Sequence, residues 1–212
     1  TDRQVAMPLF FGIDGVIHLA GLAGVRPSFA APSRYARVNV EGTATMLDLA
    51  QKANVRIFLS ASSSSVYGDA AAIPMREDCL PQPVSPYGVS KLAAEQLCYL
   101  YHANFAVPTV SLRYFTVYGP RQRPDMGFHK FLRATILGEP LTLFGDGEQT
   151  RDFTFVADAV SATVAAATKG VPGRVYNIGG GSRVSMNQVL DMIARVSGRR
   201  PQVTVDTAQK GD

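Results

Sequence analysis

Cysteine and histidine are scarce in this chain of 212 residues, and tryptophan is absent. The two cysteines, Cys79 and Cys98, lie far apart without a C-x-x-C pair, and the three histidines are not clustered. A disulfide framework needs a set of regularly spaced cysteines, and a structural zinc site needs grouped cysteine and histidine ligands. We therefore expect two reduced thiols and no bound metal.

The sequence also lacks a long hydrophobic run. Its most apolar stretch, residues 160–168, is too short to cross a bilayer, and no basic segment with an apolar core stands at its start. The net charge is +4, but lysine and arginine are interleaved with aspartate and glutamate. We expect a cytoplasmic protein with no membrane or nucleic-acid partner, in which a site for small anionic ligands explains the basic surplus.

Short apolar segments alternate with longer amphipathic ones along the chain. Hydrophobic residues make up 46% of it, which is enough to build a sizeable core. The apolar runs predict buried strands, and the 3.6-residue periodicity predicts helices. Strands are expected at residues 15–20, 55–60, 109–113, 141–144, 153–156 and 175–178, and helices at 35–53, 87–105, 128–137, 157–168 and 186–196. This alternation indicates an α/β fold with a parallel sheet and right-handed crossovers.

Tyr87 and Lys91 are the first candidates for chemistry. They stand four residues apart on a predicted helix, so both side chains share one face. A phenol has a pKa of about 10, and a neighbouring ammonium lowers it toward the range of a general base. Pro86 predicts that the helix begins at the tyrosine, near the positive end of the helix dipole. By its spacing alone, the pair is more typical of a solvated surface tyrosine and lysine, and only its context favours a catalytic role.

A run of four serines, Ser62 to Ser65, follows the predicted strand 55–60. Ligands of doubly wound sheets bind where the strands end, and a hydroxyl there could hydrogen-bond a substrate oxygen. Because Tyr87 opens the helix after the next loop, both groups are expected above the same edge of the sheet. The alternative is a solvated serine-rich loop.

Several other polar residues have both a functional and a structural interpretation. Guanidinium groups suit diphosphates because they are bidentate and permanently charged. His18 inside strand 15–20 is interpreted as a core histidine in preference to a catalytic one, and Asn39 with Thr43 could serve either the cofactor or a helix start. The arginines beside predicted strand ends, each of which could also be a surface residue, are Arg113, Arg121, Arg123 and Arg151.

Taken together, these motifs resemble those of the NAD-dependent sugar-nucleotide epimerases and dehydratases of the extended short-chain dehydrogenase/reductase family. The similar segments occur in the family's order over nearly the whole chain. They are HLAG (18–21), NVEGT (39–43), SSSSVYG (62–68), SPYGVSK (85–91), LRYFTVYGPRQRPDM (112–126), LFGDGEQTRDFTFVADA (143–159) and VYNIGGG (175–181).

The resemblance implies a Rossmann-type doubly wound parallel sheet with a smaller α/β substrate domain. It places the NAD-binding domain at residues 1–125 and 154–180, and the nucleotide-sugar domain at 126–153 and 181–212. The family opens with a strand and the pattern G-x-x-G-x-x-G, which this sequence lacks. We therefore expect that the N-terminal glycine-rich βα unit and the C-terminal end of the substrate domain are absent, and whether this chain binds NAD unaided stays open.

The resemblance also implies roles for single residues. Tyr87 would be the catalytic base, Lys91 would bind the nicotinamide ribose and tune it, and Ser63 would present the substrate-facing hydroxyl. Asn39 would lie near the cofactor phosphates and Tyr114 near the nicotinamide. The remaining expected cofactor contacts are Leu19, Ala20, Gly21 and Ser62. The expected substrate contacts are Ser63, Ser64, Thr116, Arg121, Arg123, Leu143, Phe144 and Arg151.

The positions after Ser63 discriminate between the reactions of the family. Related 4,6-dehydratases carry Asp-Glu there, and UDP-glucuronate decarboxylases carry Glu at the second position, whereas this sequence has Ser64 and Ser65. The resemblance therefore implies 4-epimerisation of a UDP-sugar by transient oxidation at C4. The substrate expected is UDP-glucuronate, with UDP-glucose or UDP-N-acetylglucosamine as the alternative. A decarboxylase or dehydratase and a non-catalytic NAD-binding regulator also remain, and family analogy implies a homodimer.

Overall fold

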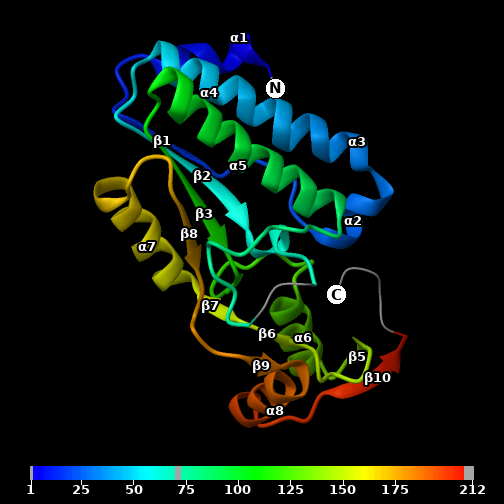
Figure 1. Cartoon of the computed structure of the whole chain (residues 1–212). Coiled ribbons are helices and arrows are strands. Elements are labelled where there is room, and N and C mark those ends of the chain that lie inside the picture. The colour runs from blue at the N-terminus through cyan, green and yellow to red at the C-terminus, as the bar shows by residue number, and fades with distance from the viewer. Residues whose placement is uncertain (1, 70–72, 208–212) are drawn as a thin grey trace. The chain divides into compact units, whose positions relative to one another are not determined.

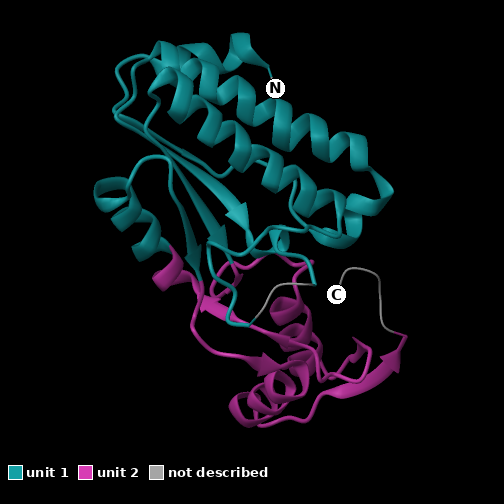
Figure 2. Cartoon of the chain, viewed as in Figure 1, with its two compact units in different colours: residues 1–114, 160–178 teal, residues 115–159, 179–212 magenta. Residues whose placement is uncertain are grey.

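The computed structural model describes residues 2–69 and 73–207, which form two compact units (Figures 1 and 2). The first unit comprises Thr1–Tyr114 and Val160–Ile178, and the second comprises Phe115–Ala159 and Gly179–Asp212. The segments of the two units interleave in sequence, and the crossings fall at 114, 159 and 178. The functional assignment of the units to cofactor and substrate stays a prediction.

A four-stranded parallel sheet forms the centre of the first unit. Its order is β1 (Gly15–His18), β2 (Ile57–Ser63), β3 (Thr109–Tyr114) and β8 (Val175–Ile178). In the register of this sheet, Ser63 stands opposite Tyr114, and Tyr114 stands opposite Ile178. The carboxyl ends of β2, β3 and β8 therefore meet at one edge. The predicted α/β class with a parallel sheet is confirmed.

Helices cover both faces of this sheet, with α4 and α5 on one side and α7 on the other (Figure 1). Neighbouring residues of β2 point to opposite faces of the sheet. Phe58 packs among Leu47 and Ala50 of α4, whereas Leu59 packs against Ala166 of α7. Full burial of a phenylalanine or leucine side chain contributes about 1.5–3 kcal/mol. The helical elements that contribute to the first unit are α1 (Arg3–Ala6), η1 (Met7–Phe10), α2 (Val25–Ala30), α3 (Pro32–Tyr35), η2 (Ala36–Glu41), α4 (Gly42–Lys52), η3 (Ser64–Val66), α5 (Pro86–Phe105) and α7 (Val156–Lys169).

The helix predicted at 35–53 is not one regular α-helix. It consists of α3, a π-helical segment η2 and α4, and Asn54 follows in the left-handed conformation with φ of 49°. The wider π-helical turn contains Asn39, whose buried side chain bonds elements outside the helix. Amphipathic periodicity does not reveal such a turn, because the apolar face continues on both sides of it.

The second unit is built from short strand pairs and helices. β4 (Thr116–Tyr118) runs parallel to β7 (Phe153–Phe155), β5 (Pro140–Phe144) runs parallel to β10 (Gln202–Asp206), and β6 (Thr150–Arg151) runs antiparallel to β9 (Val184–Ser185). The helices α6 (Gly127–Leu137) and α8 (Met186–Ser197) enclose a small core around Ala134, Leu141, Leu143 and Leu190. Within the described part of the chain, no helix is both long and apolar enough to span a bilayer.

Candidate active site

The N-terminus of α5 carries Tyr87 in its first turn. The Ser85 hydroxyl caps this helix by accepting a hydrogen bond of 3.1 Å from the Gly88 amide, and Pro86 occupies the first turn. Gly88 permits a close approach of the serine segment, because a methyl group at this position would collide with the carbonyl oxygen of Ser65. The predicted meeting of the serines with the beginning of α5 is therefore present in the structure.

Lys91 lies one turn after Tyr87 and is 8% exposed. Its Nζ donates a 2.8 Å hydrogen bond to the carbonyl oxygen of Ala61 and stands 5.9 Å from the centroid of the Tyr87 ring. Burial lowers the pKa of Lys91, because an ammonium loses hydration inside the protein. A buried lysine held by strand β2 is not a solvated surface residue, so that alternative interpretation of the pair is wrong.

The serine run begins inside strand β2, which continues to Ser63 instead of ending at residue 60 as predicted. The strand extends to that point because Ser62 and Ser63 pair with Arg113 and Tyr114 of β3. Ser63 is 8% exposed, and its Oγ accepts from the Ser65 amide and donates to the Ser65 hydroxyl, both at 3.2 Å. Ser62 is buried, and its hydroxyl donates to Glu95.

The loop after β1 approaches both Asn39 and Lys91 at Gly21. A methyl group on Gly21 would lie 3.0 Å from Oδ1 of Asn39 and 3.5 Å from Nζ of Lys91. The Asn39 amide accepts from the Leu22 amide at 2.7 Å and donates to the Leu22 carbonyl at 3.0 Å and to Ser90 Oγ at 2.9 Å. Three of the predicted cofactor contacts, Gly21, Asn39 and Lys91, are thus neighbours.

His18 is a buried residue of β1, in agreement with its structural interpretation. The Thr43 hydroxyl donates to the carbonyl oxygen of Asn39 at 2.6 Å. Its oxygen therefore accepts from Nε2 of His18 at 3.1 Å. Burial, together with the nearby charge of Lys91, lowers the pKa of His18 to about 4. The histidine is therefore neutral at pH 7.

Tyr114 ends strand β3 beside Ser63. Its hydroxyl lies 2.6 Å from Oγ1 of Thr163 on α7, and burial raises the pKa of the phenol. The structure therefore brings Tyr114 to the same sheet edge as Ser63, and its contact with a nicotinamide stays a prediction.

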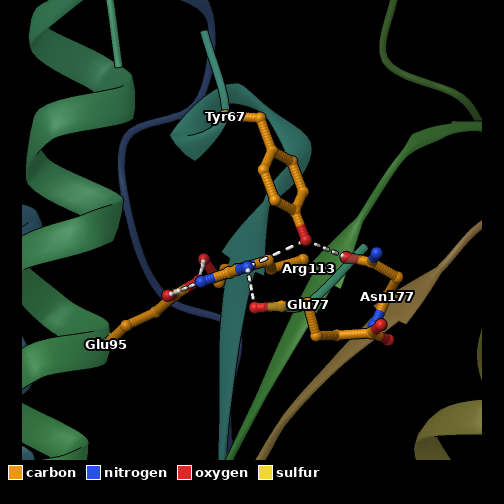
Figure 3. A network of polar contacts seen from close by, with 6 residues as sticks. Tyr67, Glu77, Glu95, Arg113 and Asn177 are labelled. Atoms are coloured by element: carbon orange, nitrogen blue, oxygen red, sulfur yellow. Dashed lines mark hydrogen bonds and ion pairs between the residues drawn. The ribbon is translucent and has the colours of Figure 1, made fainter. Parts of the chain in front are cut away.

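The structure corrects the interpretation of Arg113, which was grouped with the arginines that could bind a diphosphate. It is buried in β3 and forms a bidentate ion pair with Glu95 of α5, with distances of 2.9 Å and 2.7 Å (Figure 3). Burial opposes the charge of Arg113, but the hydrogen bonds and charge of Glu95 outweigh it and raise the pKa. The remaining nitrogen, Nη1, donates to the Tyr67 hydroxyl at 2.8 Å and to the Glu77 carbonyl at 3.5 Å.

Sequence reasoning missed Glu95, Tyr67 and Asn177, which complete this network. One signal was available, because Glu95 follows Lys91 at the same four-residue spacing by which Lys91 follows Tyr87.

The predicted substrate contacts beyond residue 114 belong to the second unit. Thr116 is half-buried at the start of β4, and Arg123 forms an exposed ion pair with Asp125, with distances of 3.0 Å and 2.6 Å. Arg121 adopts a φ of 66° and borders a cavity of about 590 Å³ that is also lined by Tyr118 and Phe128.

The remaining predicted contacts of this unit lie on β5 and β6. Leu143 is buried in the core of the unit, and Phe144 ends β5 with its carbonyl accepting a 2.8 Å bond from Gln149. Arg151 lies on β6, half-buried, and donates to the Thr150 carbonyl at 3.0 Å. Their contact with a nucleotide stays a prediction.

Comparison with known proteins matches residues 1–179 to the model of the "NAD dependent epimerase/dehydratase family". Over 194 residues the chain is 42% identical to an uncharacterized UDP-glucose epimerase, YtcB, of Bacillus subtilis, which covers 91% of this chain and 61% of that relative. It is 38% identical over 204 residues to a UDP-glucuronate 4-epimerase of Thermodesulfobacterium geofontis, covering 94% of this chain and 62% of the relative. The chain therefore spans about three fifths of the length of these relatives.

Solved structures of proteins in complex with UDP-glucuronic acid and NAD are also similar to this chain. The UDP-glucuronic acid 4-epimerase of Bacillus cereus, in complex with UDP-glucuronic acid and NAD, superposes with a TM-score of 0.93 at 43% identity over 100% of this chain and 67% of the other. MoeE5, in complex with UDP-glucuronic acid and NAD, superposes with a TM-score of 0.94 at 45% identity over 100% of this chain and 72% of the other.

Proposed function

This chain belongs to the NAD-dependent epimerase/dehydratase family, and from that premise we propose that it serves an NAD-dependent 4-epimerase of a UDP-sugar, foremost UDP-glucuronate. The observation that carries the proposal is the arrangement of Tyr87, Lys91 and the Ser63 segment around the first turns of α5. Relatives named as UDP-glucuronate 4-epimerases, with 38% and 43% identity, support the substrate.

The residues at the end of β1 fit an NAD-binding surface. Leu19 is an apolar residue with 63% exposure, and Ala20 beside it is also exposed, so both offer surface to a ligand. The bare backbone at Gly21, beside Asn39 and Lys91, leaves space that a side chain would fill. We assign these residues to cofactor binding, together with Tyr114 and the backbone of Ser62, whose hydroxyl donates to Glu95. NAD, when bound, supplies hydride acceptance from and return to C4 of the sugar.

Tyr87 is the group that moves the proton in this proposal. Its Oη takes the proton from the sugar hydroxyl during oxidation and gives it back after the ketone has turned in the site. The charge of Lys91, near its ring, and the positive end of α5 both favour the phenolate. Ser63, whose hydroxyl donates to Ser65 in the structure, redirects this hydrogen bond to the same substrate oxygen and holds it for the transfer.

The side chains after Ser63 favour epimerisation over elimination. Ser64 and Ser65 are hydroxyls, and neither is an acid or base near neutral pH as a carboxyl group is. Neither of these two positions therefore holds a side chain suited to assist the loss of water across C5 and C6 or the loss of the C6 carboxylate.

The substrate-binding residues are assigned to the second unit and to the serines. We propose that Ser64, Thr116, Arg121 and Arg123 contact the sugar, and that Leu143, Phe144 and Arg151 contact the nucleotide. UDP-glucose is the second candidate substrate, since the relative YtcB is named a UDP-glucose epimerase.

Incubation of the protein with NAD and UDP-glucuronate, followed by NMR of the products, tests the function. UDP-galacturonate is the expected product. UDP-xylose would instead identify a decarboxylase, and bound NAD without turnover of any UDP-sugar would identify a regulator. A parallel reaction with UDP-glucose decides between the two epimerase substrates.

We also propose a homodimer, in which α5 and the preceding α4 provide the interface. Exposed apolar side chains on α5 support this surface, and they are Val89, Tyr99, Leu100 and Phe105. Sedimentation velocity is expected to give the mass of two chains, and Leu100→Glu is expected to give that of one. A monomeric wild-type protein would contradict the proposal. A cytoplasmic location also stays a prediction.

A further inference from the structure

Helix α5 carries three polar residues on one face, and two of them form hydrogen bonds with the end of strand β2. Tyr87, Lys91 and Glu95 are spaced four residues apart and therefore form one stripe along the helix. Lys91 donates to the carbonyl oxygen of Ala61, and Glu95 accepts from the hydroxyl of Ser62. Two successive turns of the helix thus bind two successive residues of the strand, directly before Ser63.

The Glu95 carboxylate is itself fixed from the opposite side. Arg113 binds both of its oxygens, and the exposed fractions of the two side chains are 4% and 3%. Figure 3 shows this pair between α5 and the sheet, with Tyr67 above the guanidinium group. Cζ of Arg113 lies 4.8 Å from the centroid of the Tyr67 ring. A buried and bidentate ion pair has little freedom to rotate.

The same network continues into the segment that follows Ser63. The Tyr67 hydroxyl accepts from Arg113 and donates to Oδ1 of Asn177 at 2.8 Å, while Nδ2 of Asn177 donates to the Met75 carbonyl at 3.0 Å. Each hydrogen bond has a defined direction, so no member turns without breaking a bond. The segment containing Ser63 is therefore bound before it by Ser62 and after it by Tyr67.

We propose that Glu95 is a positioning residue, which holds Ser63 in register with Tyr87 through the Ser62 hydroxyl and the Arg113 guanidinium. This inference rests on the proposed function, because it assumes that Tyr87 and Ser63 act on one substrate oxygen. Glu95 itself touches neither substrate nor cofactor in this proposal. Its effect is on geometry, and a misplacement of about 1 Å can lower a rate by about a hundredfold.

Ser62→Ala is the test variant, because it removes the bond to Glu95 and leaves the buried ion pair in place. We expect kcat to fall by about tenfold to a hundredfold, while the KM for UDP-glucuronate and the affinity for NAD change by less than about twofold, since the variant keeps the Ser62 backbone that is assigned to NAD and alters none of the proposed substrate contacts. Ser60→Ala is the matched control. Ser60 is a buried serine on the same face of β2, and its hydroxyl contacts Cys98 instead of Glu95. This control is expected to keep wild-type kcat.

Hydrogen exchange of the backbone amides of residues 63–67 gives a readout that does not depend on turnover. Ser62→Ala is expected to accelerate their exchange at least about tenfold, and Ser60→Ala is expected to leave it unchanged. Unaltered exchange in Ser62→Ala overturns the inference, whether or not the wild-type protein epimerises a UDP-sugar. Failure of the wild-type protein to epimerise any UDP-sugar overturns the proposed function, so the two failures are distinguishable. Faster exchange with wild-type kcat assigns the network to stability alone, and a loss that appears only in NAD affinity assigns the Ser62 hydroxyl to the cofactor. Both results contradict positioning by Glu95.

Discussion

Tyr87 and Lys91 depend on burial as much as on their spacing. The lysine is held between α5 and β2, where desolvation lowers its pKa and its proton donor is directed to the Ala61 carbonyl. An ammonium in such surroundings is screened less by water than a surface lysine, so its influence on the nearby phenol is stronger. The same two residues on an exposed helix face would have little effect on each other.

Tyr87→Phe is the residue-scale prediction. Loss of the hydroxyl removes the proton acceptor, so kcat should fall by about 10²–10⁴, the range that general acid–base catalysis supplies. NAD binding should stay within about twofold because the ring and its edge-on contact with Tyr35 remain. Steady-state kinetics and NAD titration measure the two quantities.

Tyr99→Phe on the exposed face of the same helix is the control, and it should retain wild-type turnover. Retained activity in Tyr87→Phe would remove this tyrosine from the mechanism.

Single residues also show where sequence reasoning succeeds and where it fails. The spacing of Tyr87 and Lys91 sufficed to predict their common face, because helix geometry is local. Arg113 was misassigned because its sequence position indicates the end of a strand but does not indicate that a carboxylate from α5 reaches it. Partners distant in sequence, such as Asn177 for Tyr67, are set by the sheet order β2, β3, β8, which no local pattern encodes.

At the scale of elements, α5 and β3 are joined by the Arg113 and Glu95 pair. Arg113→Met should lower the free energy of unfolding by about 3–5 kcal/mol, because it leaves Glu95 charged and buried without its partner. The double variant with Glu95→Leu should recover most of this loss. Urea unfolding followed by circular dichroism provides the measurement.

Arg133→Met, which breaks the exposed pair with Glu139, is the control and should cost at most about 1 kcal/mol. A comparably small effect of Arg113→Met would show that this ion pair does not hold the two elements together.

His18 joins β1 to α4 and makes this contact sensitive to acid. Because its pKa in the folded state is about 4, below the ordinary 6.5, the unfolded chain takes up a proton first as the pH falls. Stability from this contact is complete above pH 6.5 and is lost toward pH 4, by about 3 kcal/mol in total.

His18→Gln should therefore flatten the dependence of unfolding free energy on pH in this window. Urea titrations of both proteins at several pH values between 4 and 7 compare the slopes. Equal slopes would contradict a buried, neutral histidine.

At the scale of the whole molecule, the first unit holds the proposed chemistry and the second holds the proposed nucleotide contacts. Arg151→Ala should raise the KM for the UDP-sugar about tenfold or more and leave kcat nearly unchanged, because a lost charge-assisted bond to a diphosphate weakens binding by about 1.5–3 kcal/mol.

Arg183→Ala removes an exposed arginine that contacts Thr150, the neighbour of Arg151 on β6, and it should leave KM unchanged. An unchanged KM in Arg151→Ala would defeat the diphosphate assignment. The family resemblance implied two interleaved units with crossings at 125, 153 and 180, whereas the structure divides the chain at 114, 159 and 178. The end of β3 and the interior of α7, where two of these crossings fall, carry no break in composition.

The π-helical turn at Ala36–Glu41 has a consequence for how this chain can change over time. A π-helical turn contains one residue more than an α-helical turn, and here that turn contains Asn39, which binds Leu22 and Ser90. Deletion of one residue would leave a more regular helix, but everything on one side of the deletion would rotate by about 100° relative to the other. A more regular helix in this segment would therefore displace Asn39 from its partners. Evolution should tolerate substitutions there far more readily than changes of length.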